Sequence, residues 1–387
     1  MEKVALLKCS QYDVDQIEKK LREGFELLGG DTFLRKLIPV NSRVLLKPNF
    51  LSVIERGSPI ITHYAVFEAV VRIVKDYSDN ISFGDSPGQE DTRMAAEKSG
   101  LMEAAVKYGV KFTDFNESVR CELENPLMYK YWNIAKAALE ADVVITLPKL
   151  KTHAMMYYTG AVKNQFGCIP GTEKAEWHTK LPDANNFGKM LLDLNSVVKT
   201  SFAILDGIIA MEGNGPRNGT PRQMNTLIMG KSLTAVDSTA VRLIGYENVL
   251  AIPYLKVAYE TKWGTVLPEE IEVLGETIEN MKPHDFKLSR NAKVFNFLTP
   301  GLTSLVSALT APDPVLVEDR CIGCRKCDEV CPEKSKVISF VKHNGKTIPK
   351  WKYSNCIRCF CCQELCPKGA IITRDKALSR MLGLNRQ

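Results

Sequence analysis

Twelve cysteines are the residues of this 387-residue sequence whose spacing points most directly to chemistry. Eight of them lie near the C-terminus in two runs with one pattern, Cys-x2-Cys-x2-Cys-x3-Cys, and a proline follows each run. The runs consist of Cys321, Cys324, Cys327 and Cys331, and of Cys356, Cys359, Cys362 and Cys366. Two-residue gaps allow a tight loop to place three thiolates around one cluster, and the fourth cysteine begins a helix that carries it to the other cluster.

This spacing predicts two 4Fe-4S clusters. The expected ligands are Cys321, Cys324, Cys327 and Cys366 for the first cluster, and Cys356, Cys359, Cys362 and Cys331 for the second. Zinc sites take four ligands in two pairs and lack the third closely spaced cysteine and the trailing proline. Disulfides do not fit a chain in which no export signal is recognised. Over about residues 315–373 the sequence resembles the two-cluster ferredoxin family.

Two further cysteines fit no ligand pattern. Cys361 stands directly beside Cys362, and we expect it to be a packing residue or a thiol outside the ligand shell, although an alternative ligand register remains open. Cys168 follows the sequence Lys163-Asn164 at short range and is a candidate proton donor. A lone cysteine is also commonly a small buried hydrophobe, so both interpretations of Cys168 stand.

Basic and amide side chains gather between residues 147 and 180. The candidates for substrate binding in this segment are Lys149, Lys151, Lys163, Asn164 and Lys174. Lysine offers a mobile ammonium group, and the glycines interspersed here allow the backbone to approach a ligand closely. The segment therefore predicts binding of a carboxylate or phosphate. An ordinary basic loop that docks an acidic partner such as another ferredoxin is the alternative.

Five titratable residues join Cys168 as candidates for acid–base catalysis. His153 and His178 could donate protons, or each could be a structural histidine. Asp85, like Asp206 and Asp237, could act as an acid–base group or bind a divalent ion. Aspartates at strand ends also cap helices and turns, so a divalent metal is not indicated by the sequence.

Periodicity predicts alternating strands and helices before the cysteine runs. Strands are expected at 2–8, 43–47, 81–83, 111–115, 141–147, 201–205 and 226–229. Helices are expected at 13–28, 63–76 after a Thr62 cap, 91–107, 135–139, 184–199 and 235–244. Because the strands are nearly continuous apolar runs, the pattern indicates an α/β core with a mainly parallel sheet covered by helices on both faces. We expect a core at 1–292, a linker at 293–315, and a small ferredoxin-like α+β domain at 316–387.

Polar residues follow several of these strands. Lys47 and Asn49 come after the second strand, Asp85 after the third, and Lys149 after the strand that ends at residue 147. Ligands of open α/β sheets bind beyond the carboxyl ends of the strands, which predicts one shared site. The glycine-rich stretch 212–219 matches neither a dinucleotide fingerprint nor a phosphate-binding loop, so it could line the site or form a surface turn.

Composition excludes several classes of protein. Hydrophobic residues make up 45% and charged residues 25%, as in globular proteins, and the net charge of +6 is too small at this length to indicate nucleic-acid binding. No apolar run reaches the roughly 18 residues of a transmembrane helix. The apolar stretch at the N-terminus is too short for a signal peptide. We therefore expect a cytoplasmic protein without a membrane partner.

Five motifs in one order resemble the domain-of-unknown-function 362 family over about residues 40–245. They are Leu45-Leu46-Lys47-Pro48-Asn49, Gly84-Asp85-Ser86-Pro87-Gly88, Pro148-Lys149-Leu150-Lys151-Thr152-His153, Lys163-Asn164-x2-Gly167-Cys168, and Asp206-Gly207 with Glu212-Gly213-x-Gly215-Pro216. Members often carry a ferredoxin domain behind this core. The resemblance implies a redox-active iron–sulfur protein and says little about its substrate.

The leading hypothesis is a ferredoxin-type reductase. An external electron donor or acceptor such as ferredoxin would exchange electrons with the clusters, and a small anionic substrate would lie among the lysines of the core. No flavin motif is evident. Two alternatives remain: an electron-transfer or assembly protein without chemistry of its own, and a non-redox enzyme whose clusters are structural.

Overall fold

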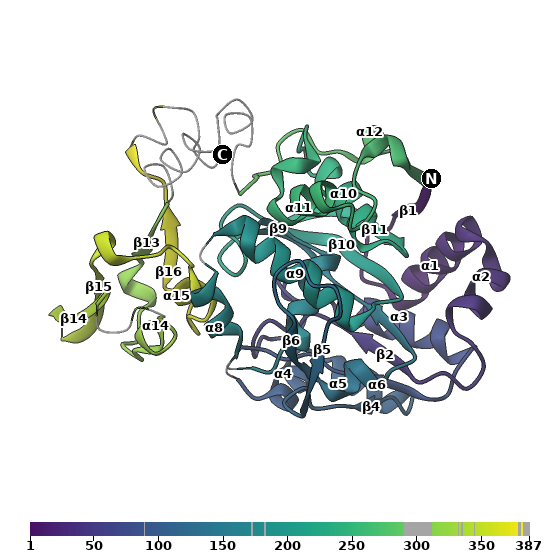
Figure 1. The fold of residues 1–387 in the computed structure, drawn as a ribbon, viewed down its shortest axis with the longest axis horizontal. Coiled ribbons are helices and arrows are strands. Elements are labelled where there is room, and N and C mark those ends of the chain that lie inside the picture. The colour runs from purple at the N-terminus through teal and green to yellow at the C-terminus, as the bar shows by residue number, and fades with distance from the viewer. Residues whose placement is uncertain are drawn as a thin grey trace.

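The computed structural model describes residues 1–289, 312–377 and 381, apart from positions 89, 172, 182, 332, 334, 335 and 344, and the side chains at 175 and 179. Most of the described chain forms one large layered unit, and a smaller unit lies beside it (Figure 1). The part of the expected linker at 293–311 lies outside the described residues. None of the described helices combines the length and the apolar character needed to cross a bilayer.

One ten-stranded sheet forms the centre of the large unit, in the order β12-β1-β11-β10-β7-β2-β3-β4, with β8 beside β10 and β9 beside β8. Its strands are β1 (Glu2–Lys8), β2 (Val44–Lys47), β3 (Ile81–Phe83), β4 (Lys111–Phe112), β7 (Val143–Thr146), β8 (Lys149–His153), β9 (Tyr157–Thr159), β10 (Phe202–Glu212), β11 (Thr220–Gly230) and β12 (Ile271–Gly275). From β10 to β4 neighbouring strands on this path are parallel, whereas β11 is antiparallel to both β1 and β10. The predicted α/β fold with a mainly parallel sheet is confirmed.

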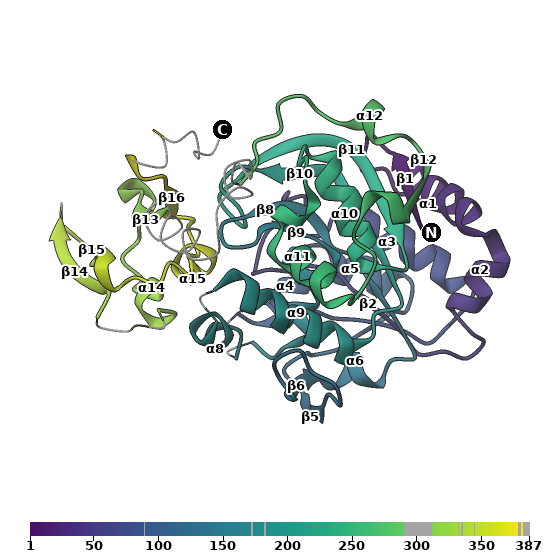
Figure 2. The same cartoon turned by 45° about the horizontal axis from the view of Figure 1, so that its top comes forward.

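Helices cover both faces of the sheet (Figure 2). They are α1 (Val14–Leu28), α2 (Gly30–Leu37), α3 (Tyr64–Lys75), α4 (Thr92–Lys98), α5 (Leu101–Lys107), α6 (Lys136–Glu140), α7 (Ala161–Asn164), α8 (Glu173–Lys180), α9 (Ala184–Val198), α10 (Leu233–Leu243), α11 (Pro253–Thr261) and α12 (Ile278–Met281). Successive strand residues enter opposite cores: Leu45 packs in the cluster with α9 to α11, and Leu46 in the cluster with α1 and α3. This explains why the strands read as unbroken apolar runs.

Three local expectations differ from the structure. The helix expected over 91–107 is two helices, α4 and α5, because Gly100 between them takes a left-handed conformation with φ of 81°. The N-cap of α3 is His63, whose Nδ1 accepts the amide of Ala65 at 3.2 Å. Thr62 instead donates its hydroxyl to the carbonyl of Leu147 at 2.5 Å. Residues 149–153, expected to follow a strand, form β8 themselves.

In the described part of the smaller unit, two strand pairs and two short helices surround the cysteine runs. β13 (Asp313–Leu316) pairs with β16 (Ile371–Arg374), and β14 (Ile338–His343) pairs with β15 (Lys346–Trp351), both antiparallel. The helices are α14 (Lys326–Glu329) and α15 (Cys361–Glu364). β13 begins inside the segment expected to be linker. Of the two helices, α15 is the one beside α8 of the core (Figure 1).

Candidate functional site

A cavity lies between the carboxyl side of the core sheet and the smaller unit, and its space, open mouth included, is about 810 Å³. Of the candidates predicted from sequence, its lining includes Asn49, Asp85, Lys151, His153, Lys163, Asn164, Lys174 and His178. Five elements supply these residues: the loop after β2, the loop after β3, strand β8, helix α7 and helix α8. The basic cavity, as we call it, therefore gathers residues from distant parts of the chain.

Lys163 supplies an amino group to the cavity. Its residue is 8% exposed, and its Nζ lies over the ring of Phe166, 5.3 Å from the ring centroid. Among the described residues, Nζ makes neither a hydrogen bond nor an ion pair. Burial lowers the pKa of Lys163, and the carboxylate of Glu364 opposes that shift. An amino group in this position has hydrogen bonds to offer to a ligand.

Lys151 and Lys174 are each held by one backbone carbonyl. Lys151 donates to Ile60 at 2.9 Å, and Lys174 donates to Ser86 at 2.5 Å. Burial is the main cause that lowers the pKa of each lysine to about 7. Each ammonium group has three donors, so both retain capacity for an anion in the cavity.

The two histidines differ in their environment. His153 Nδ1 accepts the amides of Met155 and Met156 at 3.1 and 3.2 Å, and its Nε2 lies 3.9 Å from Oε2 of Glu364. His178 stacks on Phe187 with ring centroids 4.7 Å apart, and its Nδ1 has no hydrogen-bond partner among the described residues. Burial lowers the pKa of His178 to about 4, so its imidazole is neutral near neutral pH.

The floor of the cavity is a buried ion pair. Lys47 Nζ lies 2.7 Å from Oδ1 of Asp85, whose Oδ2 accepts the amide of Phe50 at 2.7 Å. A Cβ added at Gly167 would lie 1.8 Å from Oδ1 of Asp85, so only glycine fits there. Asp85 therefore has both oxygens engaged and fixes the loops around the cavity. Lys47 supports the lining from below rather than forming part of it.

Lys149 and Cys168 lie outside the cavity lining. Lys149 Nζ pairs with Oδ2 of Asp206 at 2.7 Å and also donates to the hydroxyl of Tyr12 at 2.7 Å. Asp206 in turn accepts the hydroxyl of Tyr12 at 2.8 Å and the amide of His63 at 3.1 Å, so this buried cluster is internally satisfied. Burial raises the pKa of the Cys168 thiol to about 12, which keeps it protonated.

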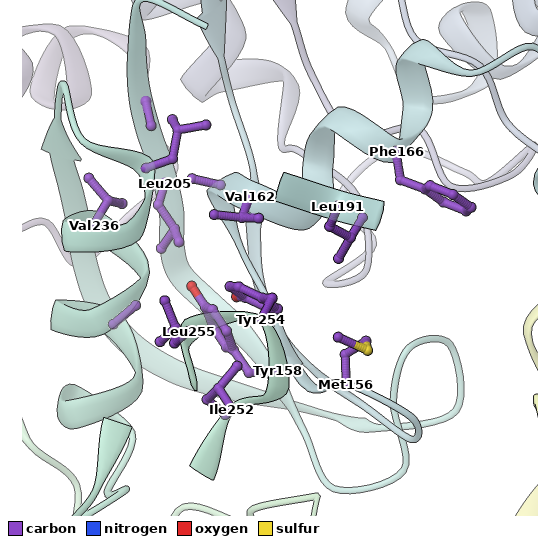
Figure 3. Close-up of a cluster of buried hydrophobic side chains, with 14 of the residues drawn as sticks. Met156, Tyr158, Val162, Phe166, Leu191, Leu205, Val236, Ile252, Tyr254 and Leu255 are labelled. Carbon is purple, nitrogen blue, oxygen red and sulfur yellow. The ribbon is translucent and has the colours of Figure 1, made fainter. Parts of the chain in front are cut away.

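Asp237 anchors the helix that carries Lys163. Its carboxylate accepts the amides of Ala161 and Val162 at 2.7 and 3.0 Å and the hydroxyls of Tyr158 and Tyr254 at 3.0 Å each. Figure 3 shows the two tyrosine rings side by side in the apolar cluster below α7. Burial raises the pKa of Asp237 to about 6 in spite of these donors. Its role is structural, because both oxygens are occupied.

Sequence reasoning missed the residues that the smaller unit contributes. Cys361, Glu364 and Leu365 line the basic cavity, and the first two belong to α15. Burial alone would raise the pKa of Glu364, but nearby basic groups, Lys163 first among them, lower it. The α15 helix follows directly from the cysteine pattern, yet the pattern does not indicate which side of that helix faces the core.

The stretch 212–219 joins the two units. It connects the long strands β10 and β11 and reaches the smaller unit through hydrogen bonds. Asn214 Oδ1 accepts from Gln363 Nε2 at 2.9 Å and from Thr373 Oγ1 at 2.7 Å, and Asn218 donates to the carbonyl of Ile371 at 2.5 Å. Arg217 donates to the carbonyl of Glu364 at 3.3 Å. These bonds hold α15 against the basic cavity.

Two smaller cavities in the C-terminal unit fit the cysteine pattern. The lining of one contains Cys321, Cys324, Cys327 and Cys366, and that of the other contains Cys331, Cys356, Cys359 and Cys362. Each cavity has four thiols and otherwise mostly apolar walls, which suits a thiolate-ligated cluster. These are the two ligand sets expected from the spacing, with the fourth cysteine of each run crossing to the other set. Cys361 lines neither cavity.

A family model described as "Domain of unknown function (DUF362)" matches residues 44–242. The chain belongs to the DUF362 family. A second model, the 4Fe-4S dicluster domain, matches residues 320–370 of this DUF362 protein and supports two 4Fe-4S clusters in its C-terminal unit. Both resemblances drawn from the sequence are thereby confirmed.

This DUF362 protein is similar to one curated protein and, distantly, to solved structures. The thylakoid-associated protein sll1697 of Synechocystis sp. is 36% identical over 238 residues, which is 61% of this chain and 73% of that protein. The lactate racemase apoprotein from Thermoanaerobacterium thermosaccharolyticum aligns with a TM-score of 0.38 and 11% identity, over 58% of this chain and 54% of that one. A Thermotoga maritima protein aligns with a TM-score of 0.35 and 10% identity, over 66% and 60%. The chain thus spans less than two thirds of either structure.

Proposed function

We propose that this DUF362 protein is an iron–sulfur oxidoreductase that exchanges electrons with a small anionic substrate, a carboxylate or a phosphate, bound in the basic cavity. The observation that carries the proposal is α15, which borders both kinds of cavity. Its Cys361 and Glu364 line the basic cavity, and Cys362 between them lines a cysteine cavity. A substrate among the lysines would therefore lie against the helix that supplies a cluster ligand.

The side chains of the basic cavity suit an anionic substrate that becomes more negative when it is reduced. When bound, the two clusters would supply single electrons. The ammonium groups of Lys151 and Lys174 would stabilise the negative charge that develops on a reduced substrate, because they lie in a largely buried site. With pKa values of about 7, both lysines can also give up a proton near neutral pH. An external electron carrier such as ferredoxin is the proposed partner, and the cytoplasm the proposed location.

A two-stage anaerobic experiment tests this function. The purified protein should contain about eight irons per chain. Sulfate, inorganic phosphate and a panel of small carboxylates are then screened for ligands that raise the melting temperature by linkage. Each stabilising anion is mixed with dithionite-reduced protein, and the visible absorbance of the oxidised clusters is followed. We expect at least one carboxylate or phosphate compound to restore that absorbance.

Substitutions separate binding from structure in the same experiment. The double variant Lys151→Ala/Lys163→Ala should lose the ligand-induced rise in melting temperature and keep its iron. Lys149→Ala should lower the melting temperature of the free protein and keep the ligand-induced rise, because Lys149 belongs to the Asp206 cluster. If anions bind but none reoxidises the protein, the carrier alternative is favoured. Protein without iron would contradict the proposal.

Anion binding should weaken as the pH rises above about 7. Lys151 and Lys174 have pKa values lowered to about 7, so both are charged below this pH and lose their protons above it. The affinity for sulfate, whose charge is constant in this range, should fall by more than about tenfold between pH 6 and pH 9. Calorimetric titration at several pH values measures this slope.

Arginine substitutions provide the control for the pH effect. Arginine stays protonated at pH 9, so Lys151→Arg and Lys174→Arg should each flatten the slope of sulfate affinity with pH. A slope that is unchanged in both variants would show that other groups set the pH dependence.

A further inference from the structure

The basic cavity contains one acidic group that is not tied into the core. Glu364 comes from α15 of the smaller unit, and its side chain is 16% exposed. Asp85, the other carboxylate of the lining, has both oxygens engaged by Lys47 and Phe50. The carboxylate of Asp85 is therefore engaged within the core, whereas the carboxylate of Glu364 faces the cavity.

The oxygens of Glu364 accept no hydrogen bond from the described residues. Among the described residues, Glu364 makes one ion-pair contact, with Nε2 of His153 at 3.9 Å from Oε2, and this distance is beyond that of a hydrogen bond. Glu364 is only partly exposed, and a carboxylate that has lost much of its contact with water is stabilised by hydrogen-bond donors. In the same cavity, neither Nδ1 of His178 nor the amino group of Lys163, which lies over the ring of Phe166, makes a hydrogen bond to a described residue.

Building on the proposed function, we infer that the ligand carries a hydrogen-bond donor, a hydroxyl or an ammonium, beside its anionic group. The anionic group would face Lys151, Lys163 and Lys174, and the donor would face Glu364. A hydroxy acid or an amino acid has this pair of groups, and a simple carboxylate has only one of them. Glu364 would then be a residue that determines specificity.

Electrostatics favours a ligand that has a hydrogen-bond donor over a simple anion in this cavity. A carboxylate repels an anion that has no hydrogen-bond donor for it. A site for simple anions would therefore bind them more tightly if Glu364 were absent. Sites built to bond a ligand's hydroxyl or amine reject the analogue that lacks it, since the protein group is then left unpaired. Arg217 and Gln363 fix the backbone on which Glu364 stands, because they bond its carbonyl and Asn214.

Three small probes of matched size test the inference: acetate, glycolate and glycine. All three are small enough for a cavity of this volume, and they differ in having no donor, a hydroxyl or an ammonium. Anaerobic holoprotein is titrated with each probe by calorimetry. We expect glycolate or glycine to bind about tenfold more tightly than acetate, the size of effect that a hydrogen bond to a charged group gives.

The Glu364→Gln variant should reduce this preference to about twofold or less and should bind acetate more tightly than the native protein. Glu329 is the matched control, because it stands two residues after Cys327 just as Glu364 stands two residues after Cys362, and it lies exposed beside Lys326. Glu329→Gln should keep the native preference. Iron content and melting temperature establish that both variants fold, and Glu364→Asp should retain part of the preference.

The outcomes separate the inference from the function on which it rests. Equal binding of all three probes by the native protein, or an unchanged preference in Glu364→Gln, would overturn the role of Glu364 and leave the anion site intact. Failure of acetate, glycolate, glycine and inorganic phosphate alike to bind would overturn the anion site itself, and with it the proposed function.

Discussion

Lys163→Met is expected to lower the affinity for sulfate by about 100-fold and to raise the melting temperature of the ligand-free protein. Loss of one member of a buried charged pair costs 2–5 kcal/mol in comparable complexes, which gives the first effect. The second effect follows because Lys163 makes neither a hydrogen bond nor an ion pair among the described residues and its Nζ lies over the ring of Phe166, so burial of its amino group is costly. Methionine keeps the length of the side chain and can pack on Phe166.

Calorimetric titration and a thermal melt of the same anaerobic preparation measure both effects. We expect a rise in melting temperature of about 1–2 °C, the shift that about 1 kcal/mol gives in a chain of 387 residues. Lys256→Met, at an exposed position of α11, is the control and should change neither quantity. A variant that melts below the native protein, or binds sulfate within threefold of native affinity, would contradict the assignment of Lys163 as an anion ligand.

Cys362→Ser is expected to lower the iron content, and Cys361→Ser is expected to leave it unchanged. Cys362 lines a cysteine cavity with Cys331, Cys356 and Cys359, so its loss should leave about four of eight irons and should abolish electron exchange with the substrate. Cys361 lines the basic cavity instead, so Cys361→Ser should keep about eight irons.

Iron analysis and low-temperature electron paramagnetic resonance of the reduced variants distinguish the two cases. Since both substitutions exchange sulfur for oxygen at adjacent positions of one helix, a general effect on folding should appear in both. If Cys361→Ser lost iron and Cys362→Ser kept it, the ligand register would be shifted by one residue.

The fold class could be predicted from the sequence because the patterns that indicate it lie within short segments. Leu45 and Leu46 face opposite cores, and this two-sided burial is what produces the apolar runs from which a covered parallel sheet was predicted. The break at Gly100 was missed because the apolar pattern continues through both short helices. The cysteine sets were predictable because the pattern itself requires the fourth ligand to cross between clusters.

The sequence predicted the candidate site only to the extent that residues at strand ends are expected to lie close together. Lys149 and Lys151 look alike in sequence, but an irregularity in β10 sets Lys149 opposite Asp206 and Lys151 opposite Met211. The first lysine is therefore neutralised within the core, and the second lines the cavity. Glu364 could not be predicted as a site residue, because its position depends on how a separate unit packs against the core.

That packing makes the basic cavity a property of the whole chain rather than of either unit. A recombinant fragment that ended before residue 293 would lack Cys361, Glu364 and Leu365, and water would reach the three lysines directly. Their pKa values would return toward that of free lysine, since burial is what lowers them. Such a fragment could retain its sheet and helices and still have lost the electrostatics on which the proposed recognition of the ligand depends.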